Sequence, residues 1–224
     1  QDILLRNNSL RTKAKEYIMM LEAGAAIEEY PVLMQHLQEI NMACDELRKW
    51  VYDESEKHSR NGKKVALLGG DHSTPLGLIQ MLASKRDFGI LQIDAHADLH
   101  TPYTTPSGNL HGMPMAVSIN KNNEECAVHD LDEETAKQWN YLKNIGKIAP
   151  KVLPEDIVFI SLRDYEKEER HLIEKYDMKV ITTKEVRSKG AENVVRAVTR
   201  YLSDCTDIYI SFDVDSLDSS ISKG

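Results

Sequence analysis

The spacing of apolar residues along the chain changes near Lys64. Before this point, two sets recur at intervals of three and four residues: Tyr17, Met20, Leu21 and Ala25, then Leu33, Leu37, Ile40, Ala43 and Leu47. This periodicity predicts amphipathic helices, the second running from Pro31 to about Ser55. We therefore expect residues 1–62 to form a helical N-terminal segment.

From Lys64 onward, short β-rich runs alternate with helical stretches. The expected strands are residues 65–68, 88–93, 157–160, 178–181 and 208–212, and the clearest expected helices are 133–143 and 191–202. Strands that alternate with helices build a parallel sheet covered on both faces. We therefore expect an α/β core over residues 63–224, and 224 residues fit a single domain of this class.

Composition narrows the range of partners. The formal net charge of -8 and a pI near 5.5 disfavour nucleic acid and anionic membranes, and suit a small cationic substrate. Cys44, Cys126 and Cys205 are too scattered to indicate a disulfide framework or a cysteine zinc site. No run approaches the roughly 18 apolar residues that a membrane span needs, and the charged first residues do not resemble a signal peptide. We expect a cytoplasmic protein.

Two short runs carry metal-binding side chains at alternate positions. They are Asp94, His96 and Asp98 in the first run, and Asp213 and Asp215 in the second. Alternate residues of an extended chain point to one side, and both runs directly follow expected strands. Because ligands bind beyond the carboxyl ends of parallel strands, we expect both runs to meet in one crevice. His72, which follows the expected strand 65–68, supplies a sixth ligand there.

The chemistry of this set favours two divalent cations. Four carboxylates at close range repel one another unless cations neutralise them. Carboxylate oxygens with two imidazoles and no thiolate favour Mn²⁺, and leave Fe²⁺, Co²⁺, Ni²⁺ and Mg²⁺ open. Two such ions about 3.5–4 Å apart make a shared water nucleophilic. The sequence therefore predicts a hydrolase.

Three motifs in this order resemble the signatures of the ureohydrolases, the arginase and agmatinase family. They are Gly69-Gly70-Asp71-His72-Ser73, Asp94-Ala95-His96-Ala97-Asp98 and Ser211-Phe212-Asp213-Val214-Asp215-Ser216-Leu217-Asp218. The resemblance runs from about Lys64 to the last residue. It implies a three-layer α/β/α fold with a central, mostly parallel sheet, two Mn²⁺ ions and a homo-oligomer, trimer or hexamer.

The resemblance also implies roles for individual residues. One ion is then held by His72, Asp94, Asp98 and Asp213, and the other by Asp94, His96, Asp213 and Asp215. Asp94 and Asp213 bridge the two ions. A hydroxide between the ions attacks the guanidino carbon of L-arginine, which yields ornithine and urea. Asp98 carries the proton to the leaving amine, and His111 exchanges protons with bulk water.

Within the family, the loop around Gly108 looks like the arginase version, which cradles an α-carboxylate. Ser107 and Asn109 are the expected donors to that carboxylate, and Glu166 and Glu169 resemble the acids that meet the α-ammonium. Glu166 stands where arginases carry Asp, and His100 stands where they carry Asn. Both departures leave open a different guanidino acid as substrate.

Other interpretations therefore remain open beside arginase: an agmatinase, a guanidino-acid or formiminoglutamate hydrolase, or a metal-binding pseudoenzyme. The family continues well beyond its last motif, and a glutamate in that later stretch grips the guanidinium group. Here the chain closes with residues 219–224. We expect residues 1–224 to be a piece of a longer natural protein.

Overall fold

A computed structural model describes residues 31–85, 87–218 and 220, with side chains from Glu46 onward. The chain divides into two compact units, residues 1–50 and 51–224. Helix α2 spans Pro31–Arg60, as the periodicity predicts for the second N-terminal helix. The apolar face that begins at Tyr17 lies outside the described residues. The expectation of a single domain stays a prediction.

The unit from Val51 onward contains a parallel sheet of four strands in the order β3-β2-β1-β4. The strands are β1 (Phe88–Ile93), β2 (Ile157–Leu162), β3 (Lys179–Thr182) and β4 (Asp207–Phe212). The helices are α3 (Leu76–Ala83), α4 (Pro114–Ser118), α5 (Glu133–Asn144), α6 (Lys167–Lys175), α7 (Thr183–Lys189) and α8 (Ala191–Tyr201). Four of the five predicted strands and both clearest predicted helices are thus confirmed.

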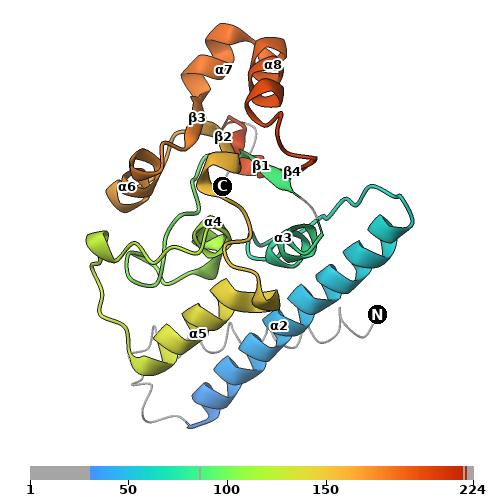
Figure 1. Ribbon diagram of the computed structural model, residues 1–224. Helices are drawn as coiled ribbons and strands as arrows, with labels where there is room; N and C mark the ends of the chain where they lie inside the picture. Colours follow the sequence, from blue (N-terminus) through green and yellow to red (C-terminus); the bar gives the residue numbers. More distant parts are fainter. Residues whose placement is uncertain (1–30, 86, 219, 221–224) are drawn as a thin grey trace. The chain divides into compact units, whose positions relative to one another are not determined.

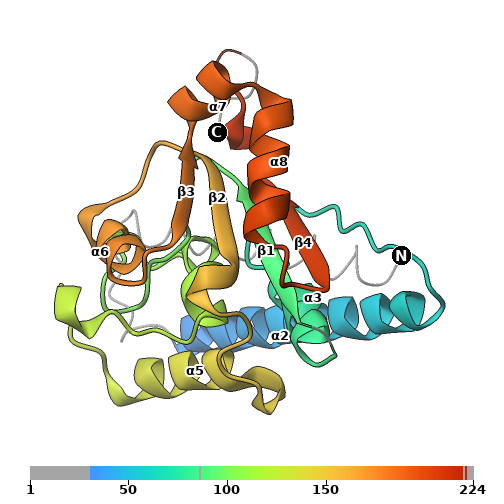
Figure 2. The same cartoon turned by 45° about the horizontal axis from the view of Figure 1, so that its top comes forward.

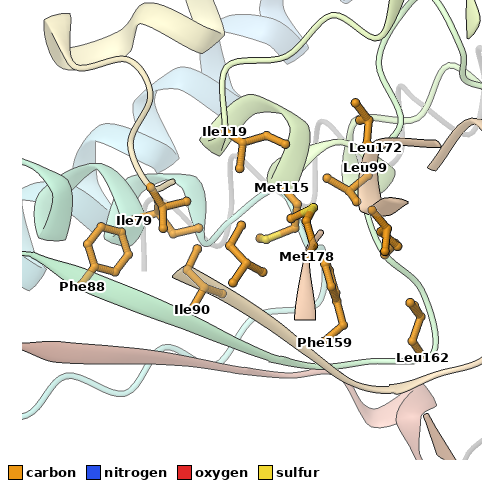
Figure 3. Packing of buried hydrophobic residues seen from close by; sticks show 14 residues of the cluster. Ile79, Phe88, Ile90, Leu99, Met115, Ile119, Phe159, Leu162, Leu172 and Met178 are labelled. Carbon is orange, nitrogen blue, oxygen red and sulfur yellow. The ribbon is translucent and has the colours of Figure 1, made fainter. Parts of the chain in front are cut away.

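Helices cover both faces of the sheet, as the sequence predicts (Figure 1). On one face, α3, α4 and α6 contribute to a core around Ile90 and Phe159, which Figure 3 shows from close by. Helix α8 covers the other face (Figure 2), and its Val194 and Val198 belong to a buried cluster with Val158 of β2. Each fully buried aliphatic or aromatic side chain of this kind contributes about 1.5–3 kcal/mol to stability. The predicted α/β/α layering is therefore confirmed.

Gly89 in β1 allows Leu202, the residue after α8, to pack closely against the sheet. A Cβ atom at this position would lie 2.9 Å from Leu202 Cδ2 and 3.1 Å from the Asp156 carbonyl oxygen. These distances are shorter than ordinary van der Waals contact, so a side chain at this position would require Leu202 or the backbone at Asp156 to shift.

Among the residues that the structure describes, the edge strand β4 is covered on one face only. Tyr209 packs partly against the core around Ile90, and Ser211 is buried. Ile208, Ile210 and Phe212 point to the opposite face, where they are 42%, 58% and 56% exposed. The α8 side chains on this face pack in a cluster with residues of β1, β2 and β3, and none of the described residues in that cluster belongs to β4.

The predicted strand over residues 65–68 is wrong. Residues 63–69 form no strand, and Leu68 is 97% exposed. A strand requires a neighbour to take up its backbone hydrogen bonds, and this run pairs with no strand of the described chain. An apolar run of four residues does not itself specify such a neighbour.

Among the described residues, no helix combines the length and the apolar character needed to cross a bilayer.

Candidate metal centre

The site lies where the order of strands reverses, between β1 and β4. The chain proceeds from β1 through β2 to β3 on one side of β1, and then returns to place β4 on the other side. Ile93 pairs with Phe212, so the residues that follow, Asp94 and Asp213, leave the sheet side by side. The Asp213 amide still donates to the Ile93 carbonyl at 2.9 Å. Such reversals form the crevice in which α/β proteins bind ligands.

His72 reaches these carboxylates from the loop before α3, rather than from a strand end as predicted. Its Nδ1 lies 2.7 Å from Asp98 Oδ2, 3.2 Å from Asp94 Oδ2 and 3.8 Å from Asp213 Oδ2. Its Nε2 lies 2.8 Å from the Ser211 hydroxyl oxygen. Ser211 thereby fixes the imidazole so that Nδ1 faces the carboxylates, a common arrangement around metal-binding histidines.

A second group forms around His96. Its Nδ1 lies 3.0 Å from Asp215 Oδ2 and 3.6 Å from Asp94 Oδ1. The Ala95 amide donates to Asp215 Oδ1 at 3.3 Å, and the Asp215 amide donates to Asp213 Oδ1 at 3.0 Å. The first of these hydrogen bonds joins the two loops, and the second orders the loop after β4.

Asp94 belongs to both groups. His72, Asp94 and Asp98 form one set of converging ligand atoms, and Asp94, His96 and Asp215 form another. The two oxygens of Asp94 face different histidines, Oδ2 toward His72 and Oδ1 toward His96. Two ligand sets that share one carboxylate, built from oxygen and imidazole donors, fit a pair of divalent cations. The individual ligand assignments stay predictions.

Protons partly neutralise the acids of this cluster. Burial lowers the pKa of His72, but hydrogen bonds to Asp94 and Asp98 outweigh burial and raise the pKa to about 10. A hydrogen bond to Asp94 likewise raises the pKa of His96 to about 9. Burial raises the pKa of Asp98, whereas the two histidines hold the pKa of Asp94 well below its usual range, against the effect of burial. A bound cation would replace these protons, because metal ligands bind in their deprotonated forms.

Asp98 also connects the site to α4. It adopts a left-handed conformation with φ of 53°, which is uncommon for residues other than glycine. Its carbonyl oxygen accepts a hydrogen bond from the Met115 amide at 3.0 Å, close to the start of α4. Backbone strain of this kind is concentrated at functional sites, where the surrounding structure maintains it.

His100, Glu166 and Glu169 form a separate cluster. His100 Nε2 lies 3.0 Å from Glu166 Oε2 and 3.6 Å from Glu169 Oε2. Glu169 is buried and accepts hydrogen bonds from the Leu99 amide at 3.0 Å and the Glu166 amide at 3.1 Å. Burial raises the pKa of Glu169 to about 8. The structure thus brings together three of the five predicted substrate contacts.

The remaining predicted residues lie on an exposed loop. Ser107 and Asn109 are exposed, and the backbone amide of Asn109 donates to the Ser107 hydroxyl at 3.3 Å. His111 is exposed in the short turn Leu110–Gly112. Its side chain forms no hydrogen bond or ion pair with any residue that the structure describes. The roles predicted for these three residues stay predictions.

The sequence analysis missed three residues that support the site. Gln92 donates to two of the carboxylates, Ser211 contacts His72, and the Arg163 guanidinium donates to the carbonyl oxygens of Ser216 and Leu217, each at 3.2 Å. Gln92 and Ser211 are the polar residues inside otherwise apolar strand runs. A polar residue inside an apolar run was therefore the sequence signal that could have identified both residues.

Comparison with known proteins adds a family match. A family model described as the arginase family matches residues 4–224. An arginase from Brevibacillus brevis is 38% identical over 159 residues, which are 70% of this chain and 48% of that protein. An arginase from Bacillus subtilis is 38% identical over 164 residues, or 72% of this chain and 50% of that protein. The chain spans about half the length of the curated relatives it matches.

Solved structures agree with the sequence match. A crystal structure of Bacillus subtilis arginase covers 82% of this chain with a TM-score of 0.67 and 34% identity, and 57% of that chain is covered. A formimidoylglutamase from Bacillus subtilis covers 81% of this chain and is covered over 48% of its own, with a TM-score of 0.59 and 19% identity. At that identity, the second likeness shows a shared fold alone.

Proposed function

The chain belongs to the arginase family, and from this premise we propose that it carries the metal ligands of a ureohydrolase acting on L-arginine. The observation that carries the proposal is the position of Asp94, whose two oxygens face two separate ligand sets at the reversal between β1 and β4. In this assignment, one Mn²⁺ is held by His72, Asp94, Asp98 and Asp213. The other is held by Asp94, His96, Asp213 and Asp215.

When bound, the metal pair would make a water molecule nucleophilic near neutral pH. The chain's own residues supply the proton transfers. Attack on the guanidino carbon forms a C–O bond, and the C–N bond to the ornithine nitrogen breaks. We assign Asp98 to move the proton from the attacking water to the departing nitrogen, because proton transfer requires a group within hydrogen-bond reach. His111, exposed on its turn, passes to solvent a different proton, the one that the bound water gives up when it becomes nucleophilic.

The amino-acid end of the substrate is assigned to the cluster around His100. Glu169 is rigid, because two backbone amides hold its carboxylate. Glu166 lies at the exposed side of the cluster and is the acid that a substrate ammonium group can reach. Ser107 and Asn109 are assigned to the substrate carboxylate.

A second candidate substrate follows from the contact between His100 and Glu166. His100 Nε2 lies 3.0 Å from Glu166 Oε2, so the α-ammonium group of a substrate must compete with the imidazole for this carboxylate. A guanidino acid without an α-ammonium group avoids this competition. The contact therefore favours a hydrolase for a different guanidino acid as the alternative to arginase.

A urea assay separates these possibilities. The Mn²⁺-loaded protein should release urea from L-arginine faster than from agmatine or 4-guanidinobutyrate, with formiminoglutamate as a further comparison followed by its own product. His111→Asn should keep the metal content and slow urea release. Turnover of 4-guanidinobutyrate without turnover of arginine would establish the alternative. Wild-type protein that binds Mn²⁺ and turns over none of the four would refute the proposed activity for this chain, which spans about half the length of its relatives.

A further inference from the structure

Gln92 is a fully buried polar residue in an apolar strand. It lies in β1, whose other residues are Phe88, Gly89, Ile90, Leu91 and Ile93. Its relative exposure is 0%, although the middle of a parallel strand is a costly place for an amide. Alternate residues of a strand share a face, so Gln92 lies on the same side as Asp94, which comes two residues later.

The Gln92 amide contacts two of the proposed metal ligands at once. Its Nε2 lies 3.3 Å from Asp94 Oδ2 and 3.2 Å from Asp98 Oδ2. An amide nitrogen carries two hydrogens, so it can donate one to each carboxylate. These are the same two oxygens that face His72 Nδ1. Gln92 and His72 therefore converge on one pair of oxygen atoms.

The other end of the amide has no partner. Gln92 Oε1 is buried and accepts no hydrogen bond from a described residue. Burying an unmade acceptor costs free energy, and a leucine of similar size would avoid that cost. The reversed amide would place Oε1 against two carboxylate oxygens, so the carboxylates fix its orientation.

We infer that Gln92 is a positioning residue that holds the Asp94 and Asp98 carboxylates together so that both can ligate one cation. The two N–H groups offset the repulsion between the acids. The inference rests on the proposed function only in taking Asp94 and Asp98 as ligands of the same ion. Residues that orient metal ligands in this way commonly change metal affinity about 10–100-fold when they are replaced.

Replacing the amide by an apolar group of similar size tests this role. In chelator-treated protein, Gln92→Leu removes the unmade acceptor together with the two hydrogen bonds to the carboxylates, so the melting temperature should change little. The same variant should bind Mn²⁺ about 10–100-fold more weakly by isothermal titration calorimetry. A residue that only fills space would not produce weaker metal binding without a loss of stability.

Two further variants keep the test decisive. Ser118→Ala removes another buried hydrogen bond, from the Ser118 hydroxyl to the Pro114 carbonyl, and should leave Mn²⁺ affinity unchanged. If Gln92→Leu does not fold, Gln92→Asn retains the amide but withdraws it from the carboxylates, and should also weaken Mn²⁺ binding. Unchanged affinity in the folded Gln92 variants, or an equal loss in Ser118→Ala, would overturn the inference.

Failure of this inference is distinguishable from failure of the proposed activity. Wild-type protein that binds Mn²⁺ but releases no urea refutes the activity, while weaker binding by Gln92→Leu still supports the positioning role. Wild-type protein that releases urea, with an unchanged Mn²⁺ affinity in Gln92→Leu, refutes the positioning role alone. Wild-type protein that binds no Mn²⁺ refutes both.

Discussion

His72 Nδ1 and Asp98 Oδ2 lie 2.7 Å apart, although one residue precedes α3 and the other follows β1. At this distance, the imidazole and the carboxylate share a charge-assisted hydrogen bond. Asp94 and Asp213 surround the same nitrogen at longer distances. In the absence of a cation, protons on the histidines therefore balance the acids, which makes the metal-free protein sensitive to pH.

This sensitivity has a definite sign. The pKa values of His72 and His96, about 10 and about 9, lie above their common unfolded value of 6.5. Their contribution to the free energy of unfolding is therefore fully present below pH 6.5 and is lost as pH rises through about 9 and about 10. Thermal denaturation of chelator-treated protein should show a falling melting temperature over this range. A melting temperature that rises from pH 7 to 10 would contradict the charge state assigned to the pair.

Removing a bridging carboxylate should have a larger effect on metal content than removing a terminal one. Asp94→Ala and Asp213→Ala should each lose both ions, because each residue is assigned to both. Asp215→Ala should retain one ion in the set of His72, Asp94 and Asp98. Elemental analysis after gel filtration measures the stoichiometry. One full equivalent of Mn²⁺ retained by Asp94→Ala would refute the bridging assignment.

The contact between His100 and Glu166 predicts that substitutions at the two positions are coupled. Glu166→Asp shortens the acid, and His100→Asn removes its imidazole partner at 3.0 Å. The double variant should raise kcat/KM for L-arginine relative to 4-guanidinobutyrate by about tenfold, more than the single changes combined. Residues in contact commonly couple by about 0.5–3 kcal/mol. Strictly additive effects on the ratio of kcat/KM values would show that the pair does not determine specificity.

Gly89→Ala should destabilise the protein without changing its chemistry. The added methyl group would lie 2.9 Å from Leu202 Cδ2, and the nearby Asp156 carbonyl oxygen belongs to the backbone and cannot easily move. Overpacking of this kind commonly costs about 1–3 kcal/mol. Urea denaturation of Mn²⁺-loaded protein measures the loss, and Gly70→Ala is a matched control, because a Cβ there meets nothing within 4 Å. Equal midpoints for the two variants would show that the sheet yields at Gly89.

The sequence predicted those parts of the fold that repeat a pattern. The alternation of apolar runs and helices predicted β1 to β4, and alternate acids after two of these strands predicted the acidic cluster. The strand order was not available from the same pattern, because it depends on long-range pairing. It is this order that places Asp94 beside Asp213.

Supporting residues escaped prediction for a different reason. The position of His72 depends on Ser211, and the carboxylates depend on Gln92, yet neither residue belongs to a ligand type that draws attention in a sequence. The contact between His100 and Glu166 joins a loop to the start of α6, which no local spacing could indicate. The run 65–68 shows the converse, since a strongly apolar sequence formed no strand.

The uncovered side of β4 has a consequence for handling the 224-residue chain. Ile208, Ile210 and Phe212 form a row of exposed apolar side chains on the edge strand of the sheet. A further strand can pair with an exposed edge strand, and natural proteins prevent such pairing with lysine, proline or a covering segment. Dilute solutions will therefore keep this polypeptide dispersed better than concentrated ones. Ile210→Lys, on the face opposite Ser211, is the substitution that we expect to reduce such association.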